Sequence, residues 1–316
     1  MGSSKIESHG ISSRLYAGEA DLQNMLDLLM QGRSRTNDWH YAHIGELLWN
    51  YFMLLCHLDP CQHIRLWHAG DQLVAFAILG EDPTVDVQVL LEYEWDGIEE
   101  EAFIWADALL ANLRQQDSQN WSGNLVSGAR QDDSPRLQFL EQHGFRYVGR
   151  FAEVNMLRWL DDTMPDLPVP EDFHVREVSQ DEIADRAAAQ HDVWQPWSVG
   201  NVTQADYLRF IQLPMYRGEL DVVTVTPEGV IAAYVNGWID PLNHIGDIGP
   251  VGARPAYRRQ GCTRLGLLEC LHRMKALGMD RVCISTGIHN TPARRLYESL
   301  GFKVVNQYLD FEYAQP

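Results

Sequence analysis

The sequence predicts an α/β protein with two domains of related fold, each a mixed β-sheet covered by helices. Three features support this prediction: the length, an internal repeat, and alternating strand-like and helix-like stretches. The 316 residues exceed one typical compact domain and are enough for two of about 150 residues each. Apolar residues make up 45% of the chain, a composition typical of globular proteins and not of disordered ones.

A repeated helix relates the two halves. The segments SPRLQFLEQHGF (134–145) and TPARRLYESLGF (291–302) lie 157 residues apart and share Pro, Glu, Gly and Phe without a gap. Each has the signals of a short helix, with Ser134 or Thr291 as the expected N-cap, Pro at the first helical position and Gly after the last turn. Both are preceded by predicted strands, at 124–130 and 281–287.

Both halves also share a strand–turn–helix start and a hairpin. The hairpin turns are predicted at Gly70-Asp71 and at Pro227-Glu228-Gly229, each between apolar stretches. The stretch DDTMPDLPVPED (161–172) has three prolines and five acidic residues and is the predicted linker. The predicted domains are therefore 1–160 and 173–316. The order of strands and helices in each requires a mixed sheet with helices on its faces.

The charge and the cysteines limit the partners and the compartment. The net charge is −19, from 25 Lys and Arg against 44 Asp and Glu, so we expect neither nucleic acid nor a membrane as a partner. No apolar run approaches the roughly 20 residues that cross a bilayer, and the start lacks the pattern of a signal peptide. Five scattered cysteines suit free thiols in a reducing compartment. We expect a cytoplasmic protein, a monomer or homodimer, without a metal.

One segment of this acidic chain is basic. A strand that breaks at Pro255 leads into the loop RRQGCT (258–263) and then into a helix predicted to stop at Gly278. A strand, a glycine-containing loop and a helix N-terminus together present backbone N–H groups to a phosphate. The alternative is a solvated basic loop before an ordinary helix. Four arginines fall within eleven residues here: Arg254, Arg258, Arg259 and Arg264.

The stretch from Pro255 to Phe302 resembles the GNAT superfamily of N-acetyltransferases. The family pattern P-x-Y-R-x-x-G-x-(small)…N-x-x-A-x-x-L-Y-x-x-x-G-F is matched at Pro255, Tyr257, Arg258, Gly261, Thr263, Asn290, Ala293, Leu296, Tyr297, Gly301 and Phe302. Together with the repeat, this makes the chain similar to tandem GNAT proteins of the mycothiol synthase type in architecture. The resemblance implies two GNAT-like domains, of which 173–316 binds acetyl-CoA.

The resemblance implies a cofactor site residue by residue. The exposed backbone of the strand before the loop would pair with the pantetheine arm, and these residues are Val251, Gly252 and Ala253. The loop and the helix N-terminus would hold the pyrophosphate, and these residues are Arg258, Arg259, Gln260, Gly261, Cys262, Thr263 and Arg264. The family usually has Gly or Ala at the position of Thr263. Asn290 would lie near the cofactor arm.

The implied reaction is attack of a neutral amine on a thioester, which needs a base, donors to the oxyanion and an acid. Backbone N–H groups near Val251 would serve the oxyanion. Tyr297 matches the family residue that protonates the leaving thiolate, and its alternative role is that of a core aromatic. Related sequences often carry Glu where this chain has Gly249. Asp247 lies on the same face of the strand and is the candidate base, with Asp240, His244, a water chain or a plain surface role for Asp247 as alternatives.

The first half is predicted to be a degenerate copy. At the spacing of 157, Glu101, Ile104 and Leu140 take the places of Arg258, Gly261 and Tyr297. The segment 92–103 is acidic where the second copy is basic, and we expect no phosphate loop in it. Like charges would oppose a pyrophosphate there. We expect this half to serve packing or to shape the acceptor pocket.

The predicted function is transfer of acetyl from acetyl-CoA to a primary amine of a small molecule or peptide, by direct attack in a ternary complex. Alternatives are a non-catalytic acyl-CoA-binding or interaction module, and an acyltransferase that uses a longer acyl chain. Five aromatic residues fall in segments that line acceptor pockets in this family, although core packing explains them equally well: Trp194, Trp197, Tyr207, Tyr216 and Trp238.

Overall fold

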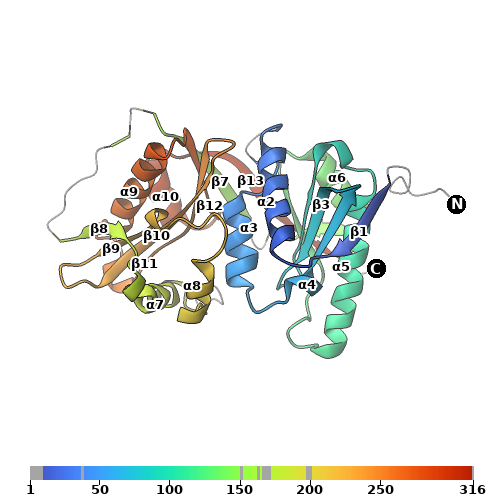
Figure 1. Cartoon of the computed structure of the whole chain (residues 1–316), viewed down its shortest axis with the longest axis horizontal. Helices are drawn as coiled ribbons and strands as arrows, with labels where there is room; N and C mark the ends of the chain where they lie inside the picture. Colours follow the sequence, from blue (N-terminus) through green and yellow to red (C-terminus); the bar gives the residue numbers. More distant parts are fainter. Residues whose placement is uncertain are drawn as a thin grey trace. The chain divides into compact units, whose positions relative to one another are not determined.

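The computed structural model describes residues 10–36, 39–149, 152–161, 164–165, 172–196 and 201–314 (Figure 1). Contacts divide the chain into two compact units. The first combines the ranges 1–42, 57–153 and 306–316, and the second combines 43–56 and 154–305. Each unit therefore takes a short segment from the other half of the sequence. The predicted division at 1–160, 161–172 and 173–316 follows the repeat, and it stays a prediction.

The first unit is built on an antiparallel sheet of order β1-β2-β3-β4. Its strands are β1 (Ile11–Leu15), β2 (Ile64–Ala69), β3 (Gln72–Leu79) and β4 (Val85–Val89). The predicted hairpin is confirmed, since Ala69 pairs with Gln72 across the turn at Gly70. The helices are α2 (Glu19–Arg33), α4 (Pro60–His63), η2 (Leu91–Tyr93), α5 (Ile98–Gln116) and α6 (Ser134–Gln142).

Three further strands complete the first unit. β5 (Val126–Arg130) and β6 (Phe145–Tyr147) both pair with β13 (Lys303–Tyr313), which comes from the end of the chain. β5 meets the end of the loop before β4 in one parallel bridge, between Thr84 and Val126. β4 and β5 are therefore next to each other at this end without forming a continuous ladder.

The second unit is a mixed sheet of order β7-β12-β11-β10-β9-β8. Its strands are β7 (Glu153–Trp159), β8 (His174–Glu177), β9 (Asp221–Val225), β10 (Ile231–Asp240), β11 (Ile245–Ala253) and β12 (Arg281–Gly287). β11 and β12 are parallel, and a helix connects them, as parallel neighbours require. The helices are α3 (Ile44–Leu47), η1 (Leu48–Leu54), η3 (Gln180–Glu182), α7 (Ile183–Trp194), α8 (Gln204–Phe210), η5 (Gly218–Leu220), η6 (Pro255–Tyr257), α9 (Cys262–Ala276) and α10 (Thr291–Ser299).

Helices cover both faces of this second sheet. Figure 1 shows α9 and α10 on one face and α7 and α8 on the other. The helix predicted after the basic loop is α9, and its Leu268, Leu271 and Met274 are buried in the main core of the unit. The side chains of β10 are buried from Ile231 to Asp240, as expected for a central strand covered on both faces.

The repeated helix is confirmed in both units, but its N-caps differ from the prediction. The caps are Asp133 and Asn290, whose side chains accept the backbone N–H groups of Arg136 and Ala293. The predicted caps, Ser134 and Thr291, are the first helical residues. An Asp or Asn one position earlier competes with Ser or Thr for the same role and is an equally good or better cap.

No helix in the described ranges is long and apolar enough to span a membrane. The predicted linker 161–172 lies largely outside the described residues, and so does Trp197.

Candidate functional site

β11 and β12 pair over only part of their length. The register runs from Ile245 opposite Arg281 to Ile248 opposite Ile284. β11 then continues to Ala253 and β12 to Gly287, and among the described residues these ends have no pairing with each other. The backbone of β11 beyond Ile248 thus has no strand partner on the side that faces β12. This is the segment predicted to bind the pantetheine arm.

A β-bulge marks the point where β11 leaves β12. The register with β10 shifts between Val235 and Gly237, so Gly249 and Pro250 stand opposite the single residue Asn236. The indole Nε1 of Trp238 donates to the carbonyl oxygen of Gly249 at 2.9 Å. Trp238 is 1% exposed. The bulge is therefore held from one face by a fully buried side chain.

A segment from the first half of the sequence covers that face. Gly45 of α3 packs against the Trp238 indole so closely that a Cβ at this glycine would lie 2.3 Å from the ring. Phe210 of α8 meets the same indole edge-on, with ring centroids 5.5 Å apart. The first half of the sequence thus contributes to the wall beside the bulge. Whether this half serves packing or shapes an acceptor pocket stays a prediction.

Gly252 lies where α7 touches β11. A Cβ there would lie 2.5 Å from Cγ1 of Val193 and 2.8 Å from the hydroxyl of Tyr234. Glycine at this position lets α7 pack directly against the strand. The sequence prediction placed Gly252 by resemblance alone, and this contact supplies a packing reason for it.

The basic loop ends in an uncapped helix N-terminus. Arg259 and Gly261 both have left-handed backbones, with φ of 63° and 86°. Gly261 is the N-cap of α9, which has no side-chain cap and no acidic residue in its first turn. The first N–H groups of α9 are therefore open to an anion. Space around Gly261 is open, so its backbone conformation explains the glycine.

Three of the four arginines in this basic segment form hydrogen bonds or an ion pair with neighbouring elements, and the fourth forms none with the described residues. Arg254 pairs with Asp192 of α7 at 3.0 Å. Arg258 donates to the carbonyl oxygen of Val193 at 3.4 Å, and Arg264 donates to Oγ of Ser299 at 2.7 Å. Arg259 has no hydrogen bond or ion pair with any described residue, and its side chain is exposed. Arg259 is the cation most available to a phosphate.

Tyr297 lies on α10 with its ring in the core. The side chain is 6% exposed, and its ring centroid lies 6.1 Å from that of Phe302. Burial raises the pKa of Tyr297 well above its ordinary value, so the hydroxyl is protonated at neutral pH. Within the described ranges this hydroxyl makes no hydrogen bond. It is a neutral donor whose proton is not already engaged.

Asp247 is buried on the face covered by α3, α7 and α8. It is 5% exposed, which excludes a plain surface carboxylate. Asp247 stands opposite Trp238 in the β10–β11 register, so the two side chains share a face. The neighbouring Gly246 points the other way, toward Met274 of α9. Asp247 is thus on the same face as the wall formed by Gly45 and Phe210.

The other candidate bases occupy structural positions. The carboxylate of Asp240 accepts the backbone N–H groups of Leu242 and Asn243 at 3.0 and 3.1 Å, which makes it the cap of the β10–β11 turn. His244 lies just before β11 begins, and its Nδ1 contacts the carbonyl oxygen of Gly278 at 3.1 Å. Both residues lie at the end of β11 away from the bulge.

The aromatic residues proposed for an acceptor pocket are mostly core or network residues. Tyr207 and Trp238 are 0% and 1% exposed, and Trp194 donates its indole N–H to the hydroxyl of Tyr234 at 2.8 Å. Tyr216 lines a cavity of about 340 Å³. That cavity is near the β10–β11 turn, away from the bulge. Its lining is Met215, Tyr216, Arg217, Gly218, Glu219, Ile239 and Pro241.

The buried polar network around Arg186 was not predicted from the sequence. Arg186 is 0% exposed and its Nε contacts Oδ1 of Asp221 at 3.3 Å. Its guanidinium lies 3.7 Å from the ring centroid of Tyr234. Tyr207 and Tyr216 both donate to the other oxygen of Asp221. The available signal was weak, because an arginine in an amphipathic helix usually points to solvent.

The first unit contains a loop of the same form, which corrects the sequence alignment. Trp95 and Gly97 have φ of 62° and 107°, and Gly97 is the N-cap of α5. The correct spacing for this loop is 164 residues, which aligns η2 with η6 and Gly97 with Gly261. The predicted pairing of Arg258 with Glu101 and of Gly261 with Ile104 is therefore wrong.

The reason is an insertion. Between the loop and the repeated helix, the first half has seven more residues than the second, because α5 and the connection after it are longer. At the corrected spacing Glu94, Glu99 and Glu100 replace Arg258, Thr263 and Arg264. The segment is acidic, as predicted, and its backbone has the same form as the loop at Gly261.

No group of three or more His, Cys, Asp or Glu residues suited to a metal ion is found in the described part of the chain. His63, which is close to Cys56, His57 and Cys61 in the sequence, contacts the carbonyl oxygen of Leu79 at 2.8 Å.

Comparisons with known proteins agree with this geometry. Residues 187–302 match the acetyltransferase (GNAT) family model. A mycothiol acetyltransferase of Thermomonospora curvata is 28% identical over 217 residues, which cover 66% of this chain and 68% of that protein. A mycothiol acetyltransferase of Pseudarthrobacter chlorophenolicus is 24% identical, covering 74% of this chain and 72% of that protein.

Solved structures show the same fold over nearly the whole chain. A GCN5-related N-acetyltransferase from Sphaerobacter thermophilus has a TM-score of 0.63 at 22% identity, covering 95% of this chain and 94% of that one. A tandem GNAT protein from the clavulanic acid biosynthesis pathway has a TM-score of 0.62 at 14% identity, covering 97% and 99%. The predicted α/β fold of two tandem GNAT-like domains is confirmed.

Proposed function

We propose that this chain, a GNAT-family acetyltransferase, transfers acetyl from acetyl-CoA to a primary amine of a small molecule or peptide by direct attack in a ternary complex. The observation that best supports this proposal is the separation of β11 from β12 next to an uncapped, basic helix N-terminus. An extended thioester arm can pair with free strand backbone only where such a strand lacks its neighbour, and the adjoining helix end suits a pyrophosphate.

Acetyl-CoA binding is assigned to the second unit. The backbone of Val251, Gly252 and Ala253 pairs with β10 on one side, and its other side, which faces β12, would pair with the pantetheine arm. The loop N–H groups and the free Arg259 would bind the pyrophosphate, while Arg258 and Arg264 fix the loop against α7 and α10. The remaining loop residues, Gln260, Gly261, Cys262 and Thr263, would contribute backbone groups.

Asn290 is assigned an indirect part in this site. Its Oδ1 accepts the N–H of Ala293 and its Nδ2 donates to Oγ1 of Thr286 at 3.1 Å. Asn290 therefore links the end of β12 to the start of α10. This link would set the position of Tyr297 relative to the arm that lies along β11.

The chemistry needs three groups. Asp247 would accept a proton from the acceptor ammonium, directly or through water, so that a neutral amine nitrogen forms the new C–N bond. Backbone N–H groups near Val251, at the bulge, would donate to the carbonyl oxygen as negative charge develops on it. As the C–S bond breaks, the hydroxyl of Tyr297 would donate its proton to the departing thiolate.

The acceptor is assigned to the face that bears Asp247 and Trp238. That face is covered by α7 and α8 and by the segment 43–56 from the first half of the sequence. The first half would thus act in acceptor binding through α3 and η1. Which amine binds there depends on the side chains that these helices present.

A thiol-release assay tests the proposal. The full-length chain is incubated with acetyl-CoA and a library of amines, amino acids and peptides, and free coenzyme A is measured. Amine-dependent thiol release, with the acetylated amine identified by mass spectrometry, is the expected result. Tight acetyl-CoA binding without turnover across the library would instead identify a non-catalytic binding module. Turnover only with longer acyl groups would reassign the donor.

A further inference from the structure

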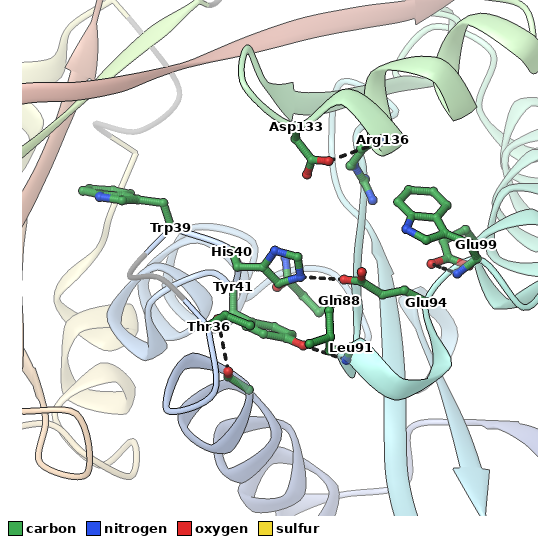
Figure 2. Close-up of polar contacts among 12 residues, drawn as sticks. Thr36, Trp39, His40, Tyr41, Gln88, Leu91, Glu94, Glu99, Asp133 and Arg136 are labelled. Atoms are coloured by element: carbon green, nitrogen blue, oxygen red, sulfur yellow. Dashed lines mark hydrogen bonds and ion pairs between the residues drawn. The ribbon is translucent and has the colours of Figure 1, made fainter.

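The phosphate-type loop of the first unit is occupied by a side chain of the unit itself. Figure 2 shows Glu99, in the first turn of α5, folded back toward the loop that precedes the helix. Its Oε1 accepts the backbone N–H of Trp95 at 3.0 Å. At the corrected spacing of 164 residues, Trp95 is the counterpart of Arg259 and Glu99 is the counterpart of Thr263.

The same N–H group is free in the second unit. The N–H of Arg259 donates to no described residue, and Thr263 makes no hydrogen bond to it. Both loops have a left-handed residue two positions before a left-handed glycine N-cap, with φ of 62° and 107° in one and 63° and 86° in the other. The difference between the loops is therefore the side chains and not the backbone.

Glu99 is an unusual residue in such a position. It is 2% exposed, and its Oε2 is buried without a hydrogen-bond partner in the described residues. Burial raises the pKa of Glu99, nearby Glu94 adds to the increase, and the positive charge of Arg136 opposes it. Among the described residues no arginine or lysine forms an ion pair with Glu99, so backbone donors and the helix N-terminus hold its carboxylate.

The acidic neighbour Glu94 makes a separate contact. Glu94 replaces Arg258, and its carboxylate contacts Nε2 of His40 at 2.5 Å. Figure 2 shows this pair beside Gln88 of β4, on the same side of the loop as Tyr41. Glu94 is thus engaged with His40 and is not part of the contact between Glu99 and Trp95.

In the first unit, the segment 39–42 lies between β4 and β5, where the proposed pantetheine site of the second unit has its counterpart. Arg130 of β5 donates to the carbonyl oxygen of Trp39 at 2.7 Å. The N–H of Ala42 donates to Oε1 of Gln88 on β4 at 3.2 Å. The segment 39–42 therefore connects the two strands beyond their single bridge at Thr84. In the second unit the matching strands, β11 and β12, have no such connection among the described residues.

We propose that the first unit retains a phosphate-binding loop in which the carboxylate of Glu99 takes the place of a phosphate group, and that removing this side-chain acceptor from the Trp95 N–H opens the loop to inorganic pyrophosphate. The inference rests on the phosphate-binding role proposed for the second loop. The proposal differs from a simple loss of basic residues. Where the backbone site is intact and an internal anion occupies it, one substitution is enough to restore anion binding.

The test uses the full-length chain with the second loop disabled by Arg258→Glu and Arg259→Glu. Pyrophosphate is titrated by calorimetry into this background, into the background with Glu99→Thr, and into the background with Glu100→Thr. The Glu100 variant is the matched control, because it removes the same charge from the same helical turn at an exposed position. Glu99→Thr should bind pyrophosphate at least tenfold more tightly than the control, which corresponds to about 1.4 kcal/mol.

Equal binding by the two variants, with both shown to be folded by circular dichroism, would overturn the proposal. If Glu99→Thr does not fold, Glu99→Ala, which also removes the acceptor for the Trp95 N–H, serves in its place with the same expected result. Glu99→Gln is a second control: it keeps an acceptor for the Trp95 N–H and should leave the loop closed, so tighter pyrophosphate binding by Glu99→Gln would also overturn the proposal. The unmodified chain reports separately on the second loop: failure of pyrophosphate to bind it at all would count against the proposed function.

Discussion

Trp238 donates its indole N–H to the carbonyl oxygen of Gly249 at 2.9 Å, and this bond fixes the bulge at which β11 leaves β12. The indole is itself held by Gly45 and Phe210 on the covered face of the sheet. A core residue thereby determines the position of the backbone that would bind the thioester. The strand proposed to bind the cofactor thus depends on packing that no motif in the sequence describes.

Trp238→Phe should therefore impair catalysis as well as stability. Phe keeps an aromatic ring but leaves the Gly249 carbonyl without its donor, at a cost of about 1–3 kcal/mol for an unpaired buried group. We expect a lower melting temperature and a kcat/KM at least tenfold below that of the unmodified chain, measured well below the melting temperature. Trp159→Phe is the control, since Trp159 is 58% exposed. Full activity in Trp238→Phe would show that the bond does not matter for the bulge.

Tyr297→Phe separates proton donation from packing. The ring would stay against Phe302 while the hydroxyl is lost, so stability and acetyl-CoA affinity should change little. The kcat should fall by roughly 10- to 10³-fold, the effect of losing one positioned proton donor. Steady-state kinetics and a melting curve measure both quantities. A lower melting temperature with unchanged kcat would return Tyr297 to a purely structural role, and an unaffected variant would mean that solvent protonates the thiolate.

Asp247 and Asp240 form a matched pair for identifying the general base. Asp247→Asn should lower kcat by roughly 10²- to 10⁴-fold, the range for removing a general base. Asp240→Asn should mainly lower the melting temperature, because Oδ2 of Asp240 accepts the side-chain N–H of Asn243 in the β10–β11 turn and an amide nitrogen in its place cannot. Comparable loss of kcat in both variants would contradict the assignment.

The buried carboxyl group of Glu99 predicts how the stability of the chain depends on pH. Its pKa is raised by burial, so the carboxyl is easier to keep protonated in the folded chain than in the unfolded one. Well below the ordinary glutamate pKa of about 4.3, Glu99 is protonated in both the folded and the unfolded chain, so its ionisation does not affect the free energy of unfolding. As the pH rises above that value, ionisation is easier in the unfolded chain, and the free energy of unfolding falls. Glu99→Gln should therefore melt a few degrees higher than the unmodified chain at pH 7.

At pH 4 the difference between the two proteins should be smaller, because Glu99 is then largely protonated in both folded and unfolded chains. Melting curves at the two pH values make the comparison. A difference that stays constant, or that grows as the pH falls, would show that the charge of Glu99 is not what destabilises this loop.

The sequence was a good guide where structure is set locally. The repeated helices, the hairpins and the loop at Gly261 are encoded by caps, turn residues and periodicity within short segments, and the structure has all of them. The caps at Asp133 and Asn290 differ by one residue from the prediction, since neighbouring polar side chains compete for one N–H group. The residue types alone therefore do not locate the start of a helix to within one residue.

Features that depend on distant packing were not predicted. Helix α3 joins the second unit because Gly45 fits against Trp238, almost two hundred residues away. The loop at Gly97 was missed because an alignment without gaps cannot allow for the seven extra residues that follow it. Arg186 and Asp221 are individually ordinary in the sequence, and only the fold shows that they form a buried pair.

The central claim is that the second loop alone binds acetyl-CoA, and calorimetric titration of the full-length chain tests it most directly. The unmodified chain should bind one acetyl-CoA per chain. Arg259→Glu should weaken this binding at least tenfold, about 1.4 kcal/mol, without changing the melting temperature, because Arg259 has no partner among the described residues. Lys303→Glu, an exposed charge reversal in the same unit, should leave the affinity nearly unchanged. Two bound acetyl-CoA molecules per chain, or full affinity in Arg259→Glu, would contradict the account.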